Sequence, residues 1–446
     1  MKKYDLSTLK YSVTVAIVFS LIFTLLLPSF AMSEEKVTIT WAINSDPQRQ
    51  PWAQSVAKKY EELHPNIKIN LLVIPWNDFD SKINTLYAAG TPVDIWTQWG
   101  ASGIGDFYYR GMLMDLTPYL KKDKFDLSDF LPSVVNMYKF GGKIYGIPIY
   151  SVGSYLYYNK KLFDEAGIAY PPSNWEDKSW TMDKFLEIAQ KLTKDYGTPQ
   201  AQYGVLDGLW PHNAWPLLFG QDIFPTSAYR NGKADTAYLT HPRVVKAIQF
   251  LQDLTYKYKV SPTPAMQQGM AAAGNPFYTG RIAMYLTGGW GWWVLKGLEK
   301  KFPWGAAALP RGATNIKDVT FSDPWVIAKT TKHPDEVWDF WKFLTSKEVI
   351  GDFMERVGAI PSRKSLLSGF YNSYPSIPPK DVETVVIGSL KYGIESPNHL
   401  MIRYDKIDSF LKNNFDLILL NKESASNVLK DMQPKFVKLL QEITKE

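Results

Sequence analysis

The chain has 446 residues, of which 45% are apolar and 21% charged, an ordinary globular balance in a chain long enough for two lobes. Its formal net charge is +6, without the basic runs interleaved with aromatic residues that are typical of nucleic-acid binding. The sequence contains no cysteine, which excludes disulfides, thiolate metal sites and a cysteine nucleophile.

The N-terminal segment has the layout of a secretory signal peptide. A basic start with Lys2, Lys3 and Lys10 precedes the apolar run 13–27, and "PSFA" places small residues before a cleavage point at Ala31. We therefore expect residues 1–31 to be removed. An uncleaved N-terminal anchor stays open as the alternative, although the run is shorter than a spanning helix requires. Because a lipid anchor would need a cysteine, the sequence predicts a free periplasmic or extracellular protein.

The first third of the mature chain alternates between strand and helix patterns. Alternating apolar residues predict strands at 37–43, 66–74 and 93–99. Helical spacing predicts helices over 51–65 and 77–90, the second with Asn77 as N-cap and Gly90 as its stop. This β-α-β-α-β order predicts a parallel or mixed sheet covered by helices.

Later segments repeat these patterns without a fixed period. "SYLYYNKKLFDEAG" predicts a strand that runs into a short helix ending at Gly167, and Thr181 is a plausible N-cap for a helix over 181–193. Further amphipathic helices are expected at 241–258 and 333–346, and two more in the tail 402–446. Since no low-complexity linker separates two domains, we expect the lobes to exchange chain several times.

The sequence lacks the common catalytic motifs. Its five histidines are scattered, and no H-E-x-x-H, P-loop, G-x-G-x-x-G or G-x-S-x-G pattern is present. "GASGIG" at 100–105 resembles a phosphate-binding loop only loosely, because it lacks the lysine. No local pattern marks the facing carboxylate pair that a glycosidase needs. No catalytic residue, metal ligand or cofactor is therefore predicted.

Aromatic residues instead gather where predicted strands end. The chain is 15% aromatic, with 16 Trp and 26 Tyr. Ligands of open α/β sheets bind outside the carboxyl ends of the strands, so these positions favour a cleft. Any single tryptophan is equally compatible with core packing, but five clusters beside turns favour flat platforms for the C–H faces of a sugar. The clusters contain Gln98 and Trp99, Tyr150, Trp210 and Trp215, Trp290 and Trp292, and Asp323 with Trp325.

In the fourth cluster the glycines have a predicted role. Gly288, Gly289 and Gly291 remove side chains beside the rings, which is expected to let backbone amides and a ligand approach closely.

Several segments together resemble a known family. In order, "WAINSDPQRQPWAQSVAKKYEELHPNIKI", "GGKIYGIPIYSVGSYLYYNKKLFDEAGI", "NPFYTGRIAMYLTGGW" and "DPWVIAKTTKHPDEVWDFWKFLTSKE" are similar to extracellular solute-binding proteins of ABC importers, of the carbohydrate type that includes maltose-binding and glycerol-phosphate-binding proteins. The resemblance implies an α/β, two-lobed periplasmic-binding-protein fold of type II, with hinge strands near 150–153, 311–319 and 346. The implied N-terminal lobe comprises 37–151 and 319–346, and the C-terminal lobe 152–318 and 347–446.

The resemblance also implies a binding site and a mechanism. A carbohydrate would be captured by hinge closure and delivered to importer membrane subunits, with ATP hydrolysis on a separate protein. The expected protein is a monomer and not an enzyme. The residues that the resemblance places at the ligand are Asp46, Gln48, Gln98, Trp99, Tyr150, Trp290, Asp323, Trp325 and Arg403 or Tyr404, to which composition adds Trp210, Trp215 and Trp292.

Three alternatives about the ligand remain at this point. The number of tryptophans favours an oligosaccharide, because each ring can cover one sugar unit. A secreted glycoside hydrolase would share the signal peptide and the aromatic residues. The same fold could also hold a polyamine or another small solute, because aromatic faces attract cations.

Overall fold

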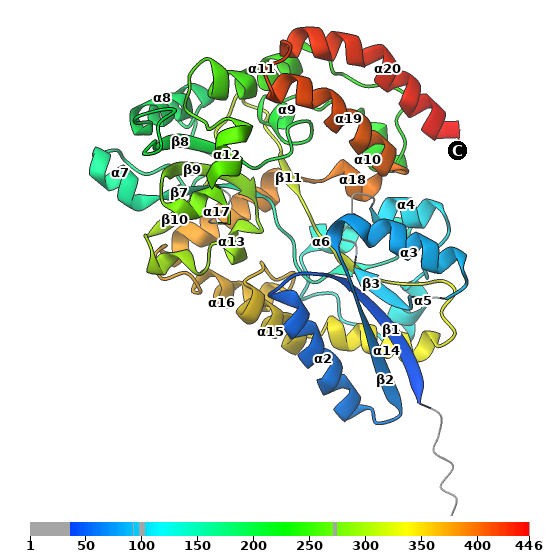
Figure 1. Cartoon of the computed structure of the whole chain (residues 1–446). Coiled ribbons are helices and arrows are strands. Elements are labelled where there is room, and N and C mark those ends of the chain that lie inside the picture. The colour runs from blue at the N-terminus through cyan, green and yellow to red at the C-terminus, as the bar shows by residue number, and fades with distance from the viewer. Residues whose placement is uncertain (1–35, 92, 98–102, 271–273, 446) are drawn as a thin grey trace, which may run out of the picture.

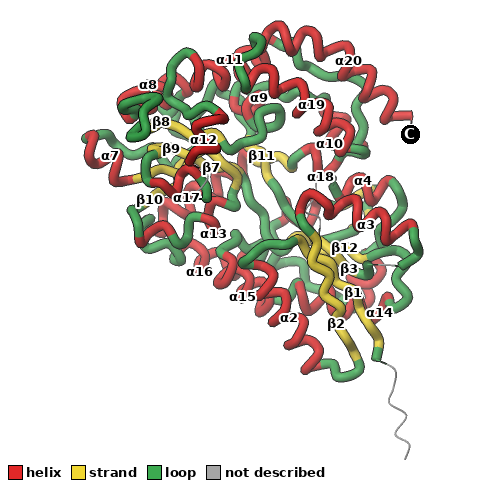
Figure 2. Tube along the Cα trace, in the orientation of Figure 1, coloured by secondary structure: helices red, strands yellow, loops and turns green. Residues whose placement is uncertain are grey.

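The structure is a computed structural model that describes residues 36–91, 93–97, 103–270 and 274–445. Two sheets, each flanked by helices, form two lobes, and the chain passes between them several times (Figures 1 and 2). The predicted signal peptide, together with Gln98 and Trp99, lies outside the described residues. Within the described ranges, no helix combines the length and apolar character that crossing a membrane would require.

The first lobe is built on a five-stranded sheet of order β2-β1-β3-β12-β6. β1 pairs in parallel with β2 and β3, whereas β12 is antiparallel to β3 and β6. The β-α-β-α-β prediction is confirmed. The strands are β1 (Val37–Asn44), β2 (Ile67–Ile74), β3 (Ile95–Thr97), β6 (Ile147–Pro148) and β12 (Pro324–Ile327), and the helices of this lobe include α2 (Arg49–Leu63), α3 (Phe79–Ala88), α4 (Ile104–Tyr109), α5 (Thr117–Lys122), α6 (Pro132–Met137) and α14 (Pro334–Leu344).

One predicted helix boundary is wrong. Asn77 does not cap the second helix, because a short 3-10 turn, η1 (Trp76–Asp78), precedes α3 and Asp78 occupies the cap position. The turn carries Trp76 to the surface, where its side chain is 40% exposed.

The second lobe is built on a four-stranded sheet of order β10-β7-β9-β8. The predicted cap at Thr181 is confirmed, since its side chain accepts a hydrogen bond from the backbone N–H of Lys184. The two tail helices are confirmed as well. The elements are β7 (Ser154–Asn159), β8 (Tyr203–Asp207), β9 (Ile282–Gly288), β10 (Trp304–Ala307), α7 (Lys160–Ala166), α8 (Met182–Leu192), α9 (Trp215–Leu218), α10 (Thr226–Asn231), α11 (Pro242–Tyr256), α12 (Pro264–Met270), α13 (Gly291–Val294), α16 (Leu367–Tyr371), α17 (Pro379–Tyr392), α19 (Tyr404–Leu419) and α20 (Ala425–Lys445).

The segments that join the two sheets lie side by side. Segment 149–153 connects β6 to β7, and it forms bridges to Phe321 through Val152 and to Pro361 through Tyr150. β11 (Asp318–Thr320), which leads into β12, pairs in parallel with β13 (Gly393–Glu395). In Figure 1, β11 and the short helix α18 (Pro397–Leu400) lie between the two sheets.

The segment that follows α14 lies against the first lobe. Helix α15 (Lys347–Val357) packs against α2 of the first lobe, where the rings of Trp52 and Phe353 lie 4.7 Å apart. This contact places the start of the segment 347–446 beside the first lobe. The division of the chain into 37–151 with 319–346 and 152–318 with 347–446 remains a prediction.

Within "GASGIG", residues 100–102 lie outside the described residues, and Gly103 and Gly105 serve close packing. A Cβ atom on Gly103 would lie 2.2 Å from the Cα of His399, and one on Gly105 would lie 2.1 Å from the carbonyl oxygen of Leu400. Only glycine allows the backbones of α4 and α18 to approach so closely. This close packing places the side chains of α18 next to the first lobe.

Candidate functional site

A cleft of about 330 Å³ opens where the joining segments meet. Its lining divides into two chemically different sets, which we name the polar wall and the aromatic wall. The polar wall consists of Asn44, Asp46, Arg49, Asp323, Asn398 and His399. The aromatic wall consists of Trp76, Tyr150, Trp210, Trp290, Trp293 and Phe321, with Val152 and Val294 beside it.

The polar wall begins in the loop between β1 and α2. The Oδ1 atom of Asp46 accepts hydrogen bonds from the backbone N–H groups of Gln48 and Arg49, both at 2.9 Å. This carboxylate thereby holds the start of α2 in place, as N-terminal capping requires. The loop after the first strand therefore reaches the cleft, as the sequence indicated.

Arg49 is a cleft residue that the sequence analysis missed. It is only 6% exposed, and its guanidinium carbon lies 5.3 Å from the ring centre of Tyr150 and 5.1 Å from that of Trp293. The positive charge is thus held between aromatic rings, where cation–π attraction offsets part of the cost of burial. Its guanidinium group brings N–H donors to the lining of the cleft.

A chain of buried polar groups continues the polar wall. The Tyr150 hydroxyl donates to Asp323, and His399 Nε2 lies 3.8 Å from Asp323 Oδ1. On its other side, His399 Nδ1 contacts Glu395 Oε1. Burial raises the pKa of Asp323 to about 6, although His399, Tyr150 and Arg49 act against this rise. The floor of the cleft is therefore electrostatically coupled.

The aromatic wall is centred on Phe321. The ring of Trp210 lies 5.5 Å from Phe321 on one side, and that of Trp290 lies 5.3 Å away on the other. These three side chains are partly exposed, so their faces are available to a ligand. Trp76 reaches the cleft from η1 of the first lobe, which gives the cleft aromatic surface from both lobes.

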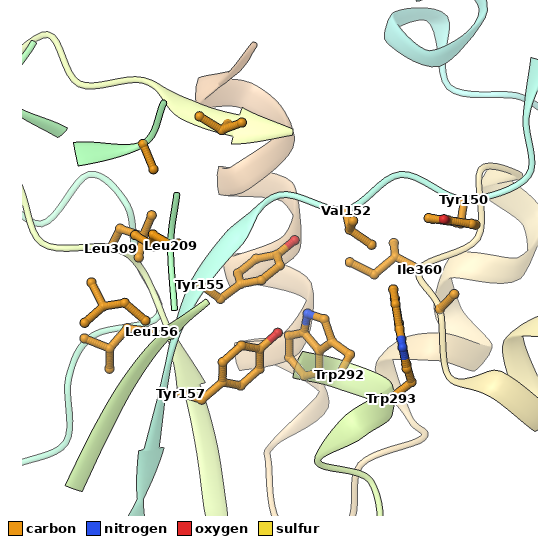
Figure 3. Packing of buried hydrophobic residues seen from close by; sticks show 14 of the residues in the cluster. Tyr150, Val152, Tyr155, Leu156, Tyr157, Leu209, Trp292, Trp293, Leu309 and Ile360 are labelled. Atoms are coloured by element: carbon orange, nitrogen blue, oxygen red, sulfur yellow. The ribbon is translucent and has the colours of Figure 1, made fainter. Parts of the chain in front are cut away.

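Three predicted tryptophans are core residues instead. Trp215, Trp292 and Trp325 are each 0% exposed, so the prediction that they contact the ligand is not supported. Figure 3 shows Trp292 beside Tyr155 and Tyr157, at ring distances of 5.6 and 5.7 Å. Trp325 packs 5.3 Å from Trp41, and the Trp215 indole N–H donates to Asp207 at 3.1 Å.

Helical geometry separates the neighbouring tryptophans. Trp290 is the N-cap of α13, and Trp293, three residues later, lies on the same side, whereas Trp292 points the other way. The i, i+3 spacing was the signal that could have selected Trp293 in place of Trp292. In Figure 3, Trp292 lies on the side of Tyr155 and Tyr157, and Trp293 lies on the side of Ile360 and Tyr150.

The glycines of this cluster serve packing, contrary to the expected role of admitting a ligand. A Cβ atom on Gly288 would lie 2.2 Å from the Trp290 ring, one on Gly289 would lie 2.4 Å from Val152, and one on Gly291 would lie 2.3 Å from Tyr157. Each glycine therefore faces protein atoms.

The remaining predicted residues lie outside the lining. The side chain of Gln48 is exposed at the cap position of α2. Arg403 pairs with Asp405, their atoms Nε and Oδ1 being 3.3 Å apart, and the buried Tyr404 hydroxyl donates to Asn213 at 3.0 Å. The structure thus brings five predicted residues to the cleft, namely Asp46, Tyr150, Trp210, Trp290 and Asp323.

Comparison with known proteins identifies the class. The model of the bacterial extracellular solute-binding protein family matches residues 44–350, so the chain belongs to this family of ABC-transporter binding proteins. Its members are binding proteins and not enzymes, and the two-lobed α/β fold agrees with its structural neighbours.

Individual relatives support this assignment. The chain is 25% identical over 393 residues to a putative binding protein of Brucella abortus, covering 86% of this chain and 89% of the relative. It is 23% identical over 342 residues to the lactose-binding protein of Rhizobium radiobacter, covering 71% and 72%.

Solved structures share the fold. An ABC substrate-binding protein of Listeria monocytogenes in complex with cycloalternan superposes with a TM-score of 0.76 at 24% identity, covering 91% of this chain and 99% of that one. A maltose-bound binding protein of T. maritima superposes with a TM-score of 0.70 at 21% identity, covering 91% and 100%.

Proposed function

We propose that the protein captures a carbohydrate, an oligosaccharide in particular, for import by an ABC transporter. The observation that carries the proposal is the composition of the cleft lining, which combines partly exposed Trp210, Trp290 and Phe321 with acidic and basic side chains. A sugar has apolar C–H faces that aromatic rings can cover and hydroxyl groups that carboxylates and guanidinium groups can bind.

The mechanism is binding followed by closure. A sugar docks against the aromatic wall, and rotation of the lobes about the joining segments brings Trp76 and the polar wall around it. Closure excludes water from the cleft, which strengthens every polar contact made there. The closed form is then recognised by the membrane permease subunits of the importer.

The glycoside hydrolase alternative has lost its support, because the family and the structural neighbours consist of binding proteins. Both lining carboxylates also have structural roles, since Asp46 accepts from the backbone N–H groups of Gln48 and Arg49 and Asp323 accepts from Tyr150. We further propose that the mature protein is a monomer in the periplasm or outside the cell, released from its signal peptide and without a lipid anchor.

A thermal-shift panel tests the proposal. It compares mannotriose, maltotriose and lactose with monosaccharides, spermidine and a glycerol phosphodiester, because a ligand that binds only the native state raises the melting temperature. We expect an oligosaccharide to give the largest rise. A rise with spermidine alone would contradict the proposal, as would chromatographic evidence that the protein cleaves an oligosaccharide it binds.

A further inference from the structure

Glu395 lies beneath the cleft and does not line it, yet it contacts a residue that does. Its side chain is 7% exposed, and its neighbour four residues on, His399, is 5% exposed. His399 faces two ways, with Nδ1 on Glu395 and Nε2 at 3.8 Å from Asp323 Oδ1. The imidazole is therefore the link between Glu395 and the cleft.

The Glu395 carboxylate is itself held by three donors from two other segments of the chain. Oε1 accepts from the Tyr138 hydroxyl at 2.8 Å and from the backbone N–H of Ser322 at 3.2 Å. Oε2 accepts from the Thr320 hydroxyl at 3.2 Å. Such donors offset part of the cost of burying a carboxylate. The carboxylate can then orient the imidazole and hold its proton.

We propose that Glu395 is a positioning residue that keeps His399 protonated and turned with Nε2–H toward the cleft, so that a sugar hydroxyl and Asp323 meet a charged donor there. The identity of the ligand as a sugar rests on the proposed function, but the effect of Glu395 on His399 does not. The arrangement is the carboxylate–imidazole pair in which one ring nitrogen is fixed so that the other can act.

Charged groups from several elements face His399. Glu395 comes from β13, Asp323 from the segment before β12, and Asp80 from α3, while the Tyr138 hydroxyl lies 3.2 Å from Nδ1. Burial by itself would lower the pKa of His399, but Glu395 and then Asp323 and Asp80 raise it above its usual value. Arg49 and Tyr150 act on Asp323, where they oppose the rise in its pKa.

The protonation states of Asp323 and His399 define a pH window for ligand binding. Asp323 must lose its proton, which occurs as the pH rises through about 6, and His399 must keep its proton, which is lost as the pH rises through its raised pKa. Since the groups interact, the limits belong to the coupled pair. A bell-shaped affinity profile results, and Glu395 sets its alkaline side.

The first test is an NMR titration of the histidine side chains in the ligand-free protein, with the His399 signal assigned from its loss in a His399→Gln variant. We expect His399 to titrate above the usual histidine range in the unaltered protein and at least about one pH unit lower in Glu395→Gln. Glu355→Gln, an exposed change on α15, is the matched control. An unmoved His399 titration in a folded Glu395→Gln protein overturns the inference.

If Glu395→Gln does not fold, Thr320→Val replaces it. This variant removes one donor from Glu395 and leaves His399 and the cleft lining in place. The titration of His399 is expected to shift in a measurable way in this variant too, and its failure to shift overturns the inference.

The second test measures maltotriose and mannotriose binding by calorimetry between pH 5 and 9. We expect Glu395→Gln to weaken binding about tenfold on the alkaline side of the profile, where the raised pKa of His399 favours its charged form in the unaltered protein, and much less on the acidic side. An equal loss at all pH values overturns the inference. Should neither sugar, nor any other in the panel, bind while the NMR shift is present, the proposed function fails and the link from Glu395 to His399 stands.

Discussion

The two walls of the cleft differ in how far they are fixed before a ligand arrives. Arg49, Asn398 and His399 of the polar wall are less than a tenth exposed, and Asp46 and Asp323 are tied to neighbouring groups. In the aromatic wall, Tyr150 and Trp293 are buried, whereas Trp210, Trp290 and Phe321 are partly exposed, with each of the two tryptophan rings beside Phe321. The polar wall is thus preorganised, whereas these three side chains of the aromatic wall still have surface to bury when the lobes close.

The largest effect on binding is expected from Arg49→Gln. Hydrogen bonds from charged groups contribute about 1.5–3 kcal/mol each, so the dissociation constant for the best oligosaccharide of the panel should rise about 10- to 100-fold by calorimetry. Arg356→Gln is the matched control, because Arg356 is exposed on α15 and bonds Ser55 and Asp352. If Arg49→Gln lowers the affinity less than threefold, the polar wall is not part of the binding site.

Trp290→Ala tests the aromatic wall. The expected result is a tenfold or greater loss of affinity with little change in melting temperature, because the ring is partly exposed and its stacking surface is lost. Trp292→Ala is the contrasting variant, since its buried ring should contribute about 3–5 kcal/mol to stability. If Trp290→Ala unfolds the protein or leaves affinity unchanged, the ring is structural and the comparison fails.

A smaller effect is expected at the mouth of the cleft. Trp76 is 40% exposed on η1, so Trp76→Ala should weaken oligosaccharide binding about threefold, in keeping with a partly solvated stacking contact of under 1 kcal/mol. Titrations of a trisaccharide and a monosaccharide compare the loss with ligand length. A larger loss for the monosaccharide would place Trp76 at the deep end rather than at the mouth.

The smallest effect is expected on stability and not on ligand binding, and it concerns the buried carboxyl group of Asp318. Burial raises the pKa of Asp318 from 3.8 to about 7. The protonated carboxyl group therefore stabilises the native state fully at pH values below the pKa of Asp318 in the unfolded chain. This contribution is lost as the pH rises through about 7. Asp318→Asn should therefore flatten the fall of melting temperature between pH 5 and 8 by a few degrees. Burial also raises the pKa of Asp207 to about 7, so part of the fall of melting temperature with pH should remain in this variant. A melting profile identical to that of the unaltered protein would contradict this assignment.

The sequence predicted the strands and helices that position the cleft, because alternation and helical spacing report burial directly. The resemblance to the family placed Asp46, Tyr150 and Trp290 at the ligand, and all three line the cleft. The sequence analysis misplaced Trp292, since the choice between adjacent tryptophans depends on the register of a four-residue helix.

Two cleft residues could not be found from local patterns. His399 acquires its role from Glu395 and from the packing of α18 on α4, contacts between segments almost 300 residues apart in the second case. Arg49 acquires its role from rings contributed by Tyr150 and Trp293. Such tertiary neighbours leave no periodic signal.

The contact of α18 with Gly103 and Gly105 bears on how a bound ligand is released. Backbones that touch without intervening side chains lack the soft, adjustable layer over which packed helices usually slide by fractions of an ångström. We expect the contact between α18 and α4 to be either fully formed or fully broken. Ligand release would then proceed in discrete steps, and single-molecule distance records would show two levels without intermediate values.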